Sequence, residues 1–438
     1  MFRTRALIAL SLGILAITAP AKPALAIGGA SVQAAQDLER QIALAESLVA
    51  QKRLAEAEAL LLAARPPARG SQHLELLLAR IRLWQGRLHE AAADFRALIA
   101  LDPANAAARE GLATALYWSG DWPAAAREYR QVLASDPQHE NARTTLRDIE
   151  RTAAGVVEAG VSLAEDDQPF RRAQGQVSFV PRAESLTRWR FDVGSALLES
   201  PDQGVSETAP FAAIHLSSSF PRSGFAVEVW TRARKFPDGE AMLLGGGAVR
   251  RSILSPHSRL SLSIDQRELL YTTTSLTTHP YVTAATLRWD LEQPSGWYAS
   301  VNAEGLRYFD DNRGAVFDAW ILRPLSPSLS LGASVGWRDT EESRFTPAGV
   351  YTPYYSPLNL REARVIVVLS RELQRGRIGL HLDTGYARET IKGSYHPFRG
   401  VATAAIPFGT NTLRLEIERS QTAFYSSNEI RASLARRF

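Results

Sequence analysis

The residue types that could do chemistry are scattered along this chain, and their spacing fits no common catalytic or metal site. The sequence has no cysteine, which excludes disulfides, zinc–thiolate sites, iron–sulfur centres and thiol catalysis. None of the eight histidines stands in a His-Glu-x-x-His or Gly-x-Ser-x-Gly setting. The stretch Ser255-Pro256-His257 is predicted to form a short turn, where a lone histidine is usually solvated. We therefore expect no enzyme activity, no cofactor and no metal.

A second group of polar residues is regularly spaced, because it alternates with apolar residues. Between residues 188 and 193, two arginines and an aspartate alternate with Trp, Phe and Val, and residues 287–292 and 413–418 follow the same pattern. A period of two indicates β-strands with one polar and one apolar face. Charges of both signs on the polar face would offer a hydrated ligand many hydrogen bonds at weak binding sites, and no single site would bind it tightly. The candidates are Arg188, Arg190, Asp192, Glu228, Arg232, Arg288, Asp290, Arg414, Glu416 and Glu418.

The elements that must position these residues are strands of one large sheet. Sixteen segments of about ten residues follow each other between residues 155 and 438. Connections after even-numbered segments are short and carry Pro or Gly, whereas most connections after odd-numbered segments are longer and polar, such as 200–207, 340–354 and 390–396. Loop lengths sorted in this way predict a transmembrane antiparallel β-barrel of about 16 strands, within a range of 12–16. Its lumen would be about wide enough for an aqueous channel.

Aromatic residues and the end of the chain agree with a barrel. Residues from 155 onward hold six of nine Trp, ten of twelve Tyr and fourteen of sixteen Phe, which is enough for two aromatic girdles in a bilayer. The last segment alternates and ends on Phe438. This ending resembles the signal read by the machinery that assembles outer-membrane barrels, which we therefore expect as a partner together with outer-membrane lipid.

Residues 38–139 repeat with a period of 34 and, with a helix expected after them, make up a domain at 38–153. Pro103 and Pro137 keep this step, and so do Leu61, Phe95 and Tyr129. A unit of two helices with small residues where the helices cross resembles the tetratricopeptide repeat. Three such units and a closing helix at 140–153 predict an all-α solenoid preceded by a linker at 27–37.

The repeat resemblance implies a concave face that binds a peptide or another protein. The groove candidates, which would lie on the first helix of each unit, are Glu46, Arg80, Thr114 and Tyr117. The alternative is a structural spacer without a ligand.

Residues 1–26 have the three parts of a secretory signal peptide. Arg3 and Arg5 give a positive start, an uncharged apolar stretch follows, and Ala24-Leu25-Ala26 forms a cleavage site. The whole chain carries 50 basic and 46 acidic residues, a near balance that argues against a nucleic-acid partner.

A signal peptide, a repeat array and a terminal barrel, in that order, resemble the exopolysaccharide export family, which includes the outer-membrane component of cellulose secretion. Tyr354-Tyr355-Ser356-Pro357 looks like a motif of the cellulose-type barrel, and the stretch 116–125 is typical of YaiO-like barrel proteins. The resemblance implies an outer-membrane conduit with polysaccharide in the lumen. It also implies a repeat domain in the periplasm that holds a periplasmic or inner-membrane protein. Trp230 and Tyr355 are candidate stacking surfaces for sugar rings.

Two alternatives remain open at this point, and a third, a hydrolase, is disfavoured. A translocator of surface lipoproteins or other proteins would combine similar parts and would need a weak seam between the first and last strands. An orphan porin-like barrel would need only a closed barrel with a polar lumen. A barrel hydrolase would need a nucleophile and a base clustered at one rim.

Overall fold

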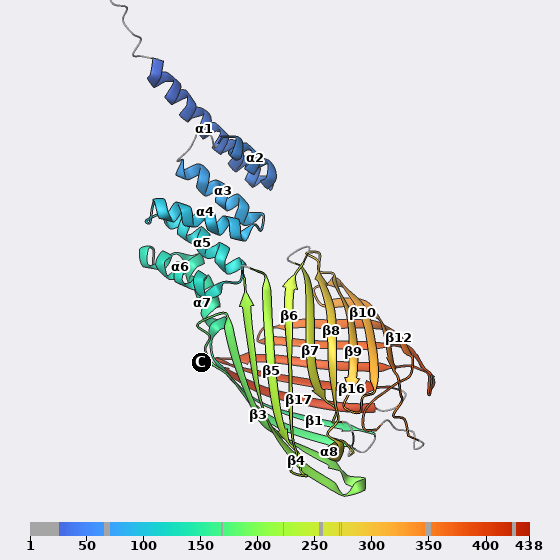
Figure 1. Cartoon of the computed structure of the whole chain (residues 1–438). Coiled ribbons are helices and arrows are strands. Elements are labelled where there is room, and N and C mark those ends of the chain that lie inside the picture. The colour runs from blue at the N-terminus through green and yellow to red at the C-terminus, as the bar shows by residue number, and fades with distance from the viewer. Residues whose placement is uncertain are drawn as a thin grey trace, which may run out of the picture. The chain divides into compact units, whose positions relative to one another are not determined.

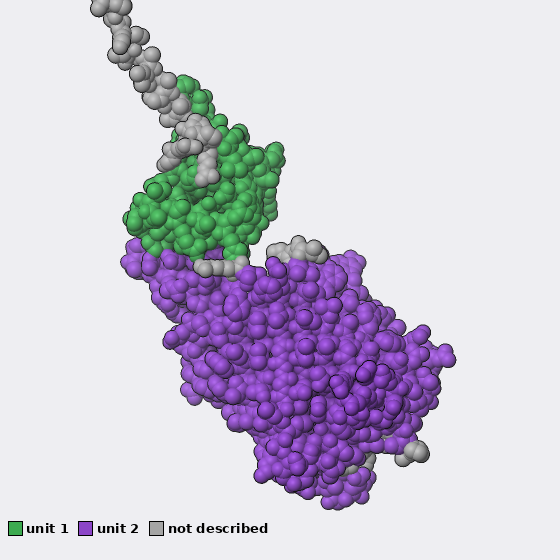
Figure 2. Space-filling model, viewed as in Figure 1, with its two compact units in different colours: residues 1–112 green, residues 113–438 purple. Residues whose placement is uncertain are grey.

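The computed structural model describes residues 26–438 except 65–70, 168–169, 222, 254–256, 271, 273, 347–351 and 423–425. The chain forms two compact units, residues 1–112 and 113–438, which divide within one helix (Figures 1 and 2). Among the described helices, none combines the length and apolar composition needed to cross a bilayer. The expected signal peptide lies outside the described residues apart from Ala26.

Helices in pairs occupy the first third of the chain, as the 34-residue period predicts. The turns inside the three pairs place Lys52, Gly86 and Gly120, which are 34 residues apart, at φ angles of 62°, 79° and 86°. Glycine has no Cβ and adopts this left-handed conformation without a steric penalty, whereas Lys52 adopts it at a steric cost. The helices are α1 (Ala26–Ala50), α2 (Leu54–Ala64), α3 (Gln72–Trp84), α4 (Leu88–Leu101), α5 (Ala106–Trp118), α6 (Trp122–Ser135) and α7 (Glu140–Ala153).

The prediction of a linker at 27–37 is wrong, because these residues belong to α1. After Gly29 this stretch has neither proline nor glycine and is rich in Ala and Gln, so nothing in it stops a helix. The closing helix at 140–153 is confirmed as α7.

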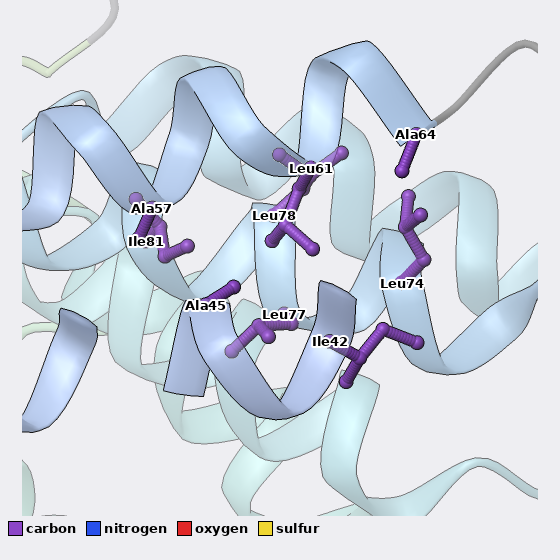
Figure 3. Close-up of a cluster of buried hydrophobic side chains, with 9 residues drawn as sticks. All are labelled: Ile42, Ala45, Ala57, Leu61, Ala64, Leu74, Leu77, Leu78 and Ile81. Atoms are coloured by element: carbon purple, nitrogen blue, oxygen red, sulfur yellow. The ribbon is translucent and has the colours of Figure 1, made fainter. Parts of the chain in front are cut away.

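The core of the first unit is built from the repeated positions. Leu61, Leu78 and the small Ala57 are fully buried in one cluster with residues of α1, α2 and α3 (Figure 3). Small side chains at the crossing let the helices approach closely. Leu44, the equivalent of Leu78 in the first repeat, is 54% exposed, since no described helix precedes α1 to cover it.

A polar network beside this core joins the first two helix pairs. The Glu58 carboxylate accepts hydrogen bonds from Gln85, at 3.0 Å, and from Arg82 and Arg87, at 3.3 and 2.7 Å. Burial alone would raise the pKa of Glu58, but these hydrogen bonds outweigh burial and hold the pKa below its usual value. Glu58 therefore stays ionised and links α2 to α3.

Sixteen antiparallel strands form a closed wall in the second unit, so the predicted barrel is confirmed. Each strand pairs with its sequence neighbours, and the first pairs with the last. The short β14 and β15 both pair with β13 in one register and make a single wall strand interrupted at Pro397. The strands are β1 (Val156–Asp166), β2 (Arg171–Val180), β3 (Thr187–Ser200), β4 (Val205–Phe220), β5 (Phe225–Lys235), β6 (Ala241–Ser252), β7 (Ser258–Glu268), β8 (Tyr281–Glu292), β9 (Tyr298–Tyr308), β10 (Arg313–Ser326), β11 (Leu329–Thr340), β12 (Leu360–Leu373), β13 (Gly376–Glu389), β14 (Gly393–Tyr395), β15 (Phe398–Phe408), β16 (Asn411–Gln421) and β17 (Ser426–Arg437).

The seam between β1 and β17 is fully paired. It runs over eleven residue pairs, from Val156 opposite Arg437 to Asp166 opposite Ser427. Beyond it, the N–H of Gly155 donates to the Phe438 carbonyl at 3.2 Å, and the N–H of Phe438 donates to the Gly155 carbonyl at 3.1 Å. The terminal residue therefore takes part in closing the barrel.

The wall has an apolar outer face, as the alternation predicts. Val193 on β3 is 57% exposed, whereas its neighbour Asp192 is 5% exposed. Near the start of β1, the outward rings of Phe438, Phe179, Phe191 and Trp189 follow each other with centroids 6.2–6.4 Å apart. Such a row is typical of the aromatic girdle of a barrel in lipid.

Loop lengths follow the predicted sorting in part. We call the rim at which β1 begins the proximal rim and the opposite one the distal rim. The two long connections, 269–280 and 341–359, both lie at the distal rim. The expected loop at 390–396 is shorter, because β14 begins at Gly393 and pairs with β13 after a turn at 390–392. The expected loop at 200–207 is shorter, because β3 reaches Ser200 and β4 begins at Val205, with only a 3₁₀ turn (Pro201–Gln203) between them.

Both long distal connections fold back over the inner wall. Leu276 of the short helix α8 (Ser275–Thr278) packs against Phe170, Ala196, Leu198 and Ala209. Tyr354, in the connection 341–359, packs against Leu269, Val282 and Tyr308. These contacts narrow the distal half of the lumen.

Candidate lumen site

All ten predicted charged residues lie on strand positions that alternate with the exposed apolar ones, so they face the lumen. Residues opposite each other on neighbouring strands share a face. Arg190 lies opposite His215, and Glu416 lies opposite Arg431, which extends the polar face to β4 and β17. The sequence thus identified the correct face of each strand.

Near the proximal rim, a polar cluster joins β3 to its neighbours. Arg190 donates to Asp192 at 2.8 Å and to Ser178 at 2.9 Å, while His215 Nε2 lies 3.1 Å from the other Asp192 oxygen. Arg188 instead donates to the Thr152 carbonyl of α7 at 2.7 Å. The role of Arg188 is therefore to connect the helix to the barrel wall.

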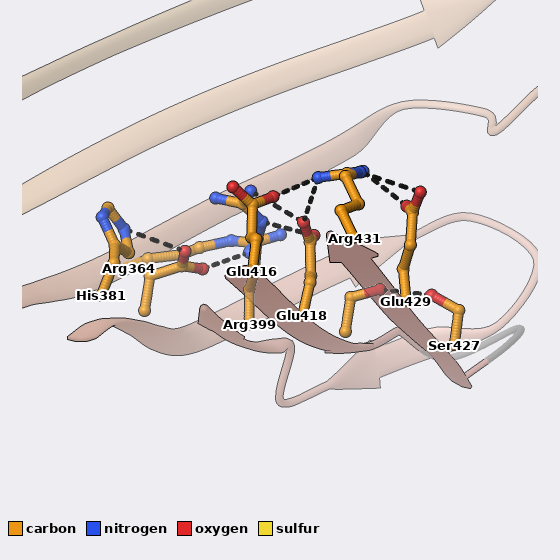
Figure 4. A network of polar contacts seen from close by, with 10 residues as sticks. Arg364, His381, Arg399, Glu416, Glu418, Ser427, Glu429 and Arg431 are labelled. Atoms are coloured by element: carbon orange, nitrogen blue, oxygen red, sulfur yellow. Dashed lines mark hydrogen bonds and ion pairs between the residues drawn. The ribbon is translucent and has the colours of Figure 1, made fainter. Parts of the chain in front are cut away.

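A second network lies on the last strands of the wall (Figure 4). Arg431 bridges Glu416 and Glu429, and Arg399 donates to Glu418 at 2.8 Å. On β16, Arg414 reaches past β17 to Glu158 of β1 at 2.9 Å. This ion pair braces the closing seam from inside.

The other predicted charges are also paired. Arg288 donates to Asp290 at 2.9 Å, and Glu228 accepts from Arg250 at 2.7 Å. Charges that neutralise each other leave a wall that is polar but locally close to neutral, as expected for shallow sites. Arg232 is the exception, since its nearest carboxylate oxygen, on Glu268, lies 3.9 Å away.

The motif residues 354–357 lie in the connection 341–359, not in a strand, because β12 begins only at Leu360. The Tyr354 hydroxyl donates to Asp310 at 2.9 Å and accepts from Asn312 at 3.0 Å. Burial raises the pKa of Tyr354 to about 12, so the hydroxyl keeps its proton. Ser356 Oγ accepts from the Arg344 N–H at 2.7 Å, and the Pro357 carbonyl accepts from Thr340 at 2.9 Å. The motif thus holds a distal loop against the wall.

The groove candidates are divided between the two units. In the first unit, Glu46 lies on α1, 3.6 Å from His73, and Arg80 is half-buried on α3. In the second, Thr114 forms a 3.2 Å hydrogen bond with Tyr129, and Tyr117 is exposed on α5. Thr114 therefore has a partner within its own helix pair, while Tyr117 is accessible.

Described residues of the lumen line three cavities of about 350, 630 and 340 Å³, and Arg172 of β2 lines each of these three. Tyr355 lines the first and Trp230 lines the third. The sequence analysis missed Arg172, and it missed the inward pair Tyr298 and Trp320, whose rings stack 5.0 Å apart. The alternation of the strands could have identified these three residues as inward-facing, because all three occupy positions of the polar face.

One sequence motif was overlooked and fails on geometry. Gly332-Ala333-Ser334-Val335-Gly336 matches Gly-x-Ser-x-Gly, but it lies within β11. A nucleophilic serine of this motif needs a sharp strand-to-helix turn, whereas Ser334 stands in a regular ladder opposite Trp320. Among the described residues, no group of three or more His, Asp or Glu is arranged to hold a metal ion.

Comparison with known proteins agrees with this architecture. A family model described as Tetratricopeptide repeat matches residues 83–149. A solved structure described as a bacterial polysaccharide outer membrane secretin matches with a TM-score of 0.54 and 11% identity, over 65% of this chain and 99% of that chain. A tetratricopeptide repeat protein from Parabacteroides merdae shares 25% identity over 27% of this chain and 47% of its own, with a TM-score of 0.25. No curated protein matches the chain.

Proposed function

We propose that this protein is an outer-membrane conduit that exports a polysaccharide and has no enzyme activity, with its repeat domain in the periplasm holding a partner protein. The observation that carries the proposal is the wall of the barrel, which is closed, apolar outside and polar inside. A sheet without free edges leaves no backbone group unpaired in lipid. The barrel fold shared with a polysaccharide secretin supports this choice.

The inner wall suits a neutral or weakly charged, well-hydrated chain. Its paired charges offer hydrogen bonds of both polarities without a strong net field at most positions. The stacked Tyr298 and Trp320, 5.0 Å apart, and the inward Trp230 add flat aromatic surfaces for sugar rings. These features favour a sugar polymer over a hydrophobic cargo.

Translocation of lipoproteins is the weaker candidate, because it needs a seam that opens. The pairing of β1 and β17 is as long as the pairing of β16 and β17, at eleven residue pairs each. The Arg414–Glu158 ion pair adds a contact across this seam. We therefore favour transport along the lumen.

Loss of the protein should stop the polymer from reaching the cell surface. A strain lacking the chain should show little surface polysaccharide by staining of intact cells, while polymer synthesis, measured in lysed cells, continues. Expression of the full chain in the deletion strain should restore the surface signal. Unchanged surface polysaccharide in the deletion strain would favour the translocator or the porin-like barrel.

The full chain should also fractionate with outer membranes. A closed barrel resists unfolding by detergent at room temperature, so the unheated protein should migrate faster on a denaturing gel than the boiled protein. A periplasmic pool that stays in solution without detergent, with no heat-dependent band, would contradict the outer-membrane placement.

A further inference from the structure

The smallest of the three lumen cavities, of about 340 Å³, differs from the rest of the wall in its charge. Four arginines line it against a single glutamate, Glu268, and the glutamine side chains of residues 174 and 266 add amide groups. The arginines are Arg172, Arg232, Arg234 and Arg267. This excess of positive charge contrasts with the paired charges elsewhere in the lumen.

Two of these arginines are already neutralised. Arg234, which is 2% exposed, donates from Nε to Glu268 at 3.0 Å and from Nη1 to the Ala209 carbonyl at 2.9 Å. Arg267 pairs with Asp265 at 2.6 Å and with Glu304 at 3.1 Å. The carboxylate of Glu268 is therefore paired mainly with Arg234.

The other two arginines have only longer contacts to carboxylates, and within the described part of the chain each keeps one N–H group without a partner. Among the described residues, the Nε–H groups of Arg172 and Arg232 are buried and meet no hydrogen-bond acceptor. Their nearest carboxylate oxygens, on Glu429 and Glu268, lie 3.8 and 3.9 Å away. Burying an unpaired N–H of a charged group is costly, so two such groups in one cavity indicate an acceptor that enters from outside the chain.

An aromatic surface lies beside these guanidinium groups. Trp230 lines the same cavity, and its ring stacks on His215 with centroids 6.4 Å apart. On β6, Gly246 leaves room for this ring, because a Cβ there would lie 2.7 Å from Trp230 Nε1. The cavity thus combines a flat aromatic face, suited to a sugar ring, with two cationic side chains whose Nε–H groups lack an acceptor among the described residues, suited to a carboxylate.

We propose that this cavity binds an acidic sugar unit of the exported chain, with the carboxylate between Arg172 and Arg232 and the sugar ring on Trp230. This inference rests on the proposed function, since it assigns a substrate class to the same lumen. A neutral sugar would leave the positive charge of the two guanidinium groups unmatched, and a free inorganic anion would not use the aromatic face.

The test is equilibrium binding to the full chain in detergent, measured by calorimetry with three probes: trigalacturonate, neutral cellotriose and inorganic phosphate. Charge-assisted hydrogen bonds discriminate by about tenfold or more, so trigalacturonate should bind at least that much more tightly than the other two probes. The double substitution Arg172→Gln, Arg232→Gln should abolish this preference. Trp230→Leu should weaken binding of trigalacturonate and leave that of phosphate unchanged.

A matched control removes two arginines from the outside of the wall. Arg251 and Arg323 are exposed and lie over the Phe225 and Trp297 rings, so Arg251→Gln with Arg323→Gln changes the net charge equally and should keep the preference. Equal binding of cellotriose, equal binding of phosphate, no binding of trigalacturonate, or a preference that survives loss of Arg172 and Arg232 would overturn the inference. Heat-dependent gel migration identifies variants that fold. The export phenotype of the deletion strain is measured independently, so failure of this site and failure of the conduit are distinguishable.

Discussion

Gly385→Ala should prevent the barrel from folding. Gly385 lies in β13 opposite Arg364 of β12, and a Cβ at this position would stand 1.9 Å from the Ala363 carbonyl oxygen and 2.7 Å from the Arg364 Cα. These are backbone atoms of a paired strand, so they move only if the ladder breaks. Overpacking usually costs about 1–3 kcal/mol, and a backbone clash this short belongs above that range.

On its other side, β13 is also held in place at Gly385 by hydrogen bonds. The Gly385 carbonyl accepts from His396 Nδ1 at 2.9 Å, and its N–H donates to the Pro397 carbonyl at 3.3 Å. These bonds lie where the wall strand is interrupted between β14 and β15. The strand is therefore fixed on both sides of the glycine.

Gly305→Ala is the matched control, because a Cβ on Gly305 of β9 would meet nothing within 4 Å. Purified or outer-membrane protein is compared before and after boiling. We expect the fast-migrating folded band for Gly305→Ala and its loss for Gly385→Ala. A folded band at the level of the unsubstituted chain in Gly385→Ala would show that the ladder can absorb the side chain.

Phe95→Ala should destabilise the repeat domain by about 3–5 kcal/mol, the range for truncating a buried aromatic side chain. Phe95 of α4 is 0% exposed, and its ring lies directly against Gly111 of α5, where a Cβ would stand 2.4 Å from the ring. Phenylalanine fills the space that glycine leaves, so truncation creates a cavity that neither helix can close.

Leu101→Ala is the control for this variant, since Leu101 stands on the same helix and is 73% exposed. Thermal unfolding of the full chain is followed by far-ultraviolet circular dichroism at a helix-sensitive wavelength, with limited trypsin digestion as a second readout. We expect a lower helix melting temperature and faster cleavage within residues 38–153 for Phe95→Ala only. Equal melting of the two variants would mean that the ring is not part of the repeat core.

The repeats were predictable because their signal is local and periodic. Helix crossings demand small residues at a fixed step, so Ala57 and its equivalents could be found without knowing the fold. The exposure of Leu44 was not predictable, because it depends on which helix, if any, packs in front of α1.

In the barrel, the sequence by itself determined the two faces of each strand and the approximate strand number. Alternation is a property of neighbouring residues, and lipid outside with water inside imposes it on every strand. The same reasoning placed Arg190, Asp192 and Glu416 on the inner wall. It also placed Trp230 there without showing what stands beside it.

Only the tertiary structure decided which inward residues meet. Arg172 on β2 and Arg267 on β7 line one cavity although 95 positions separate them in sequence. Their meeting depends on closure of the wall and on the register of every strand between them, and a register is set by pairings that no local pattern encodes. For the same reason, the two arginine Nε–H groups of this cavity that have no partner among the described residues could be identified only from the partners that the other charged groups of the lumen have in the folded barrel.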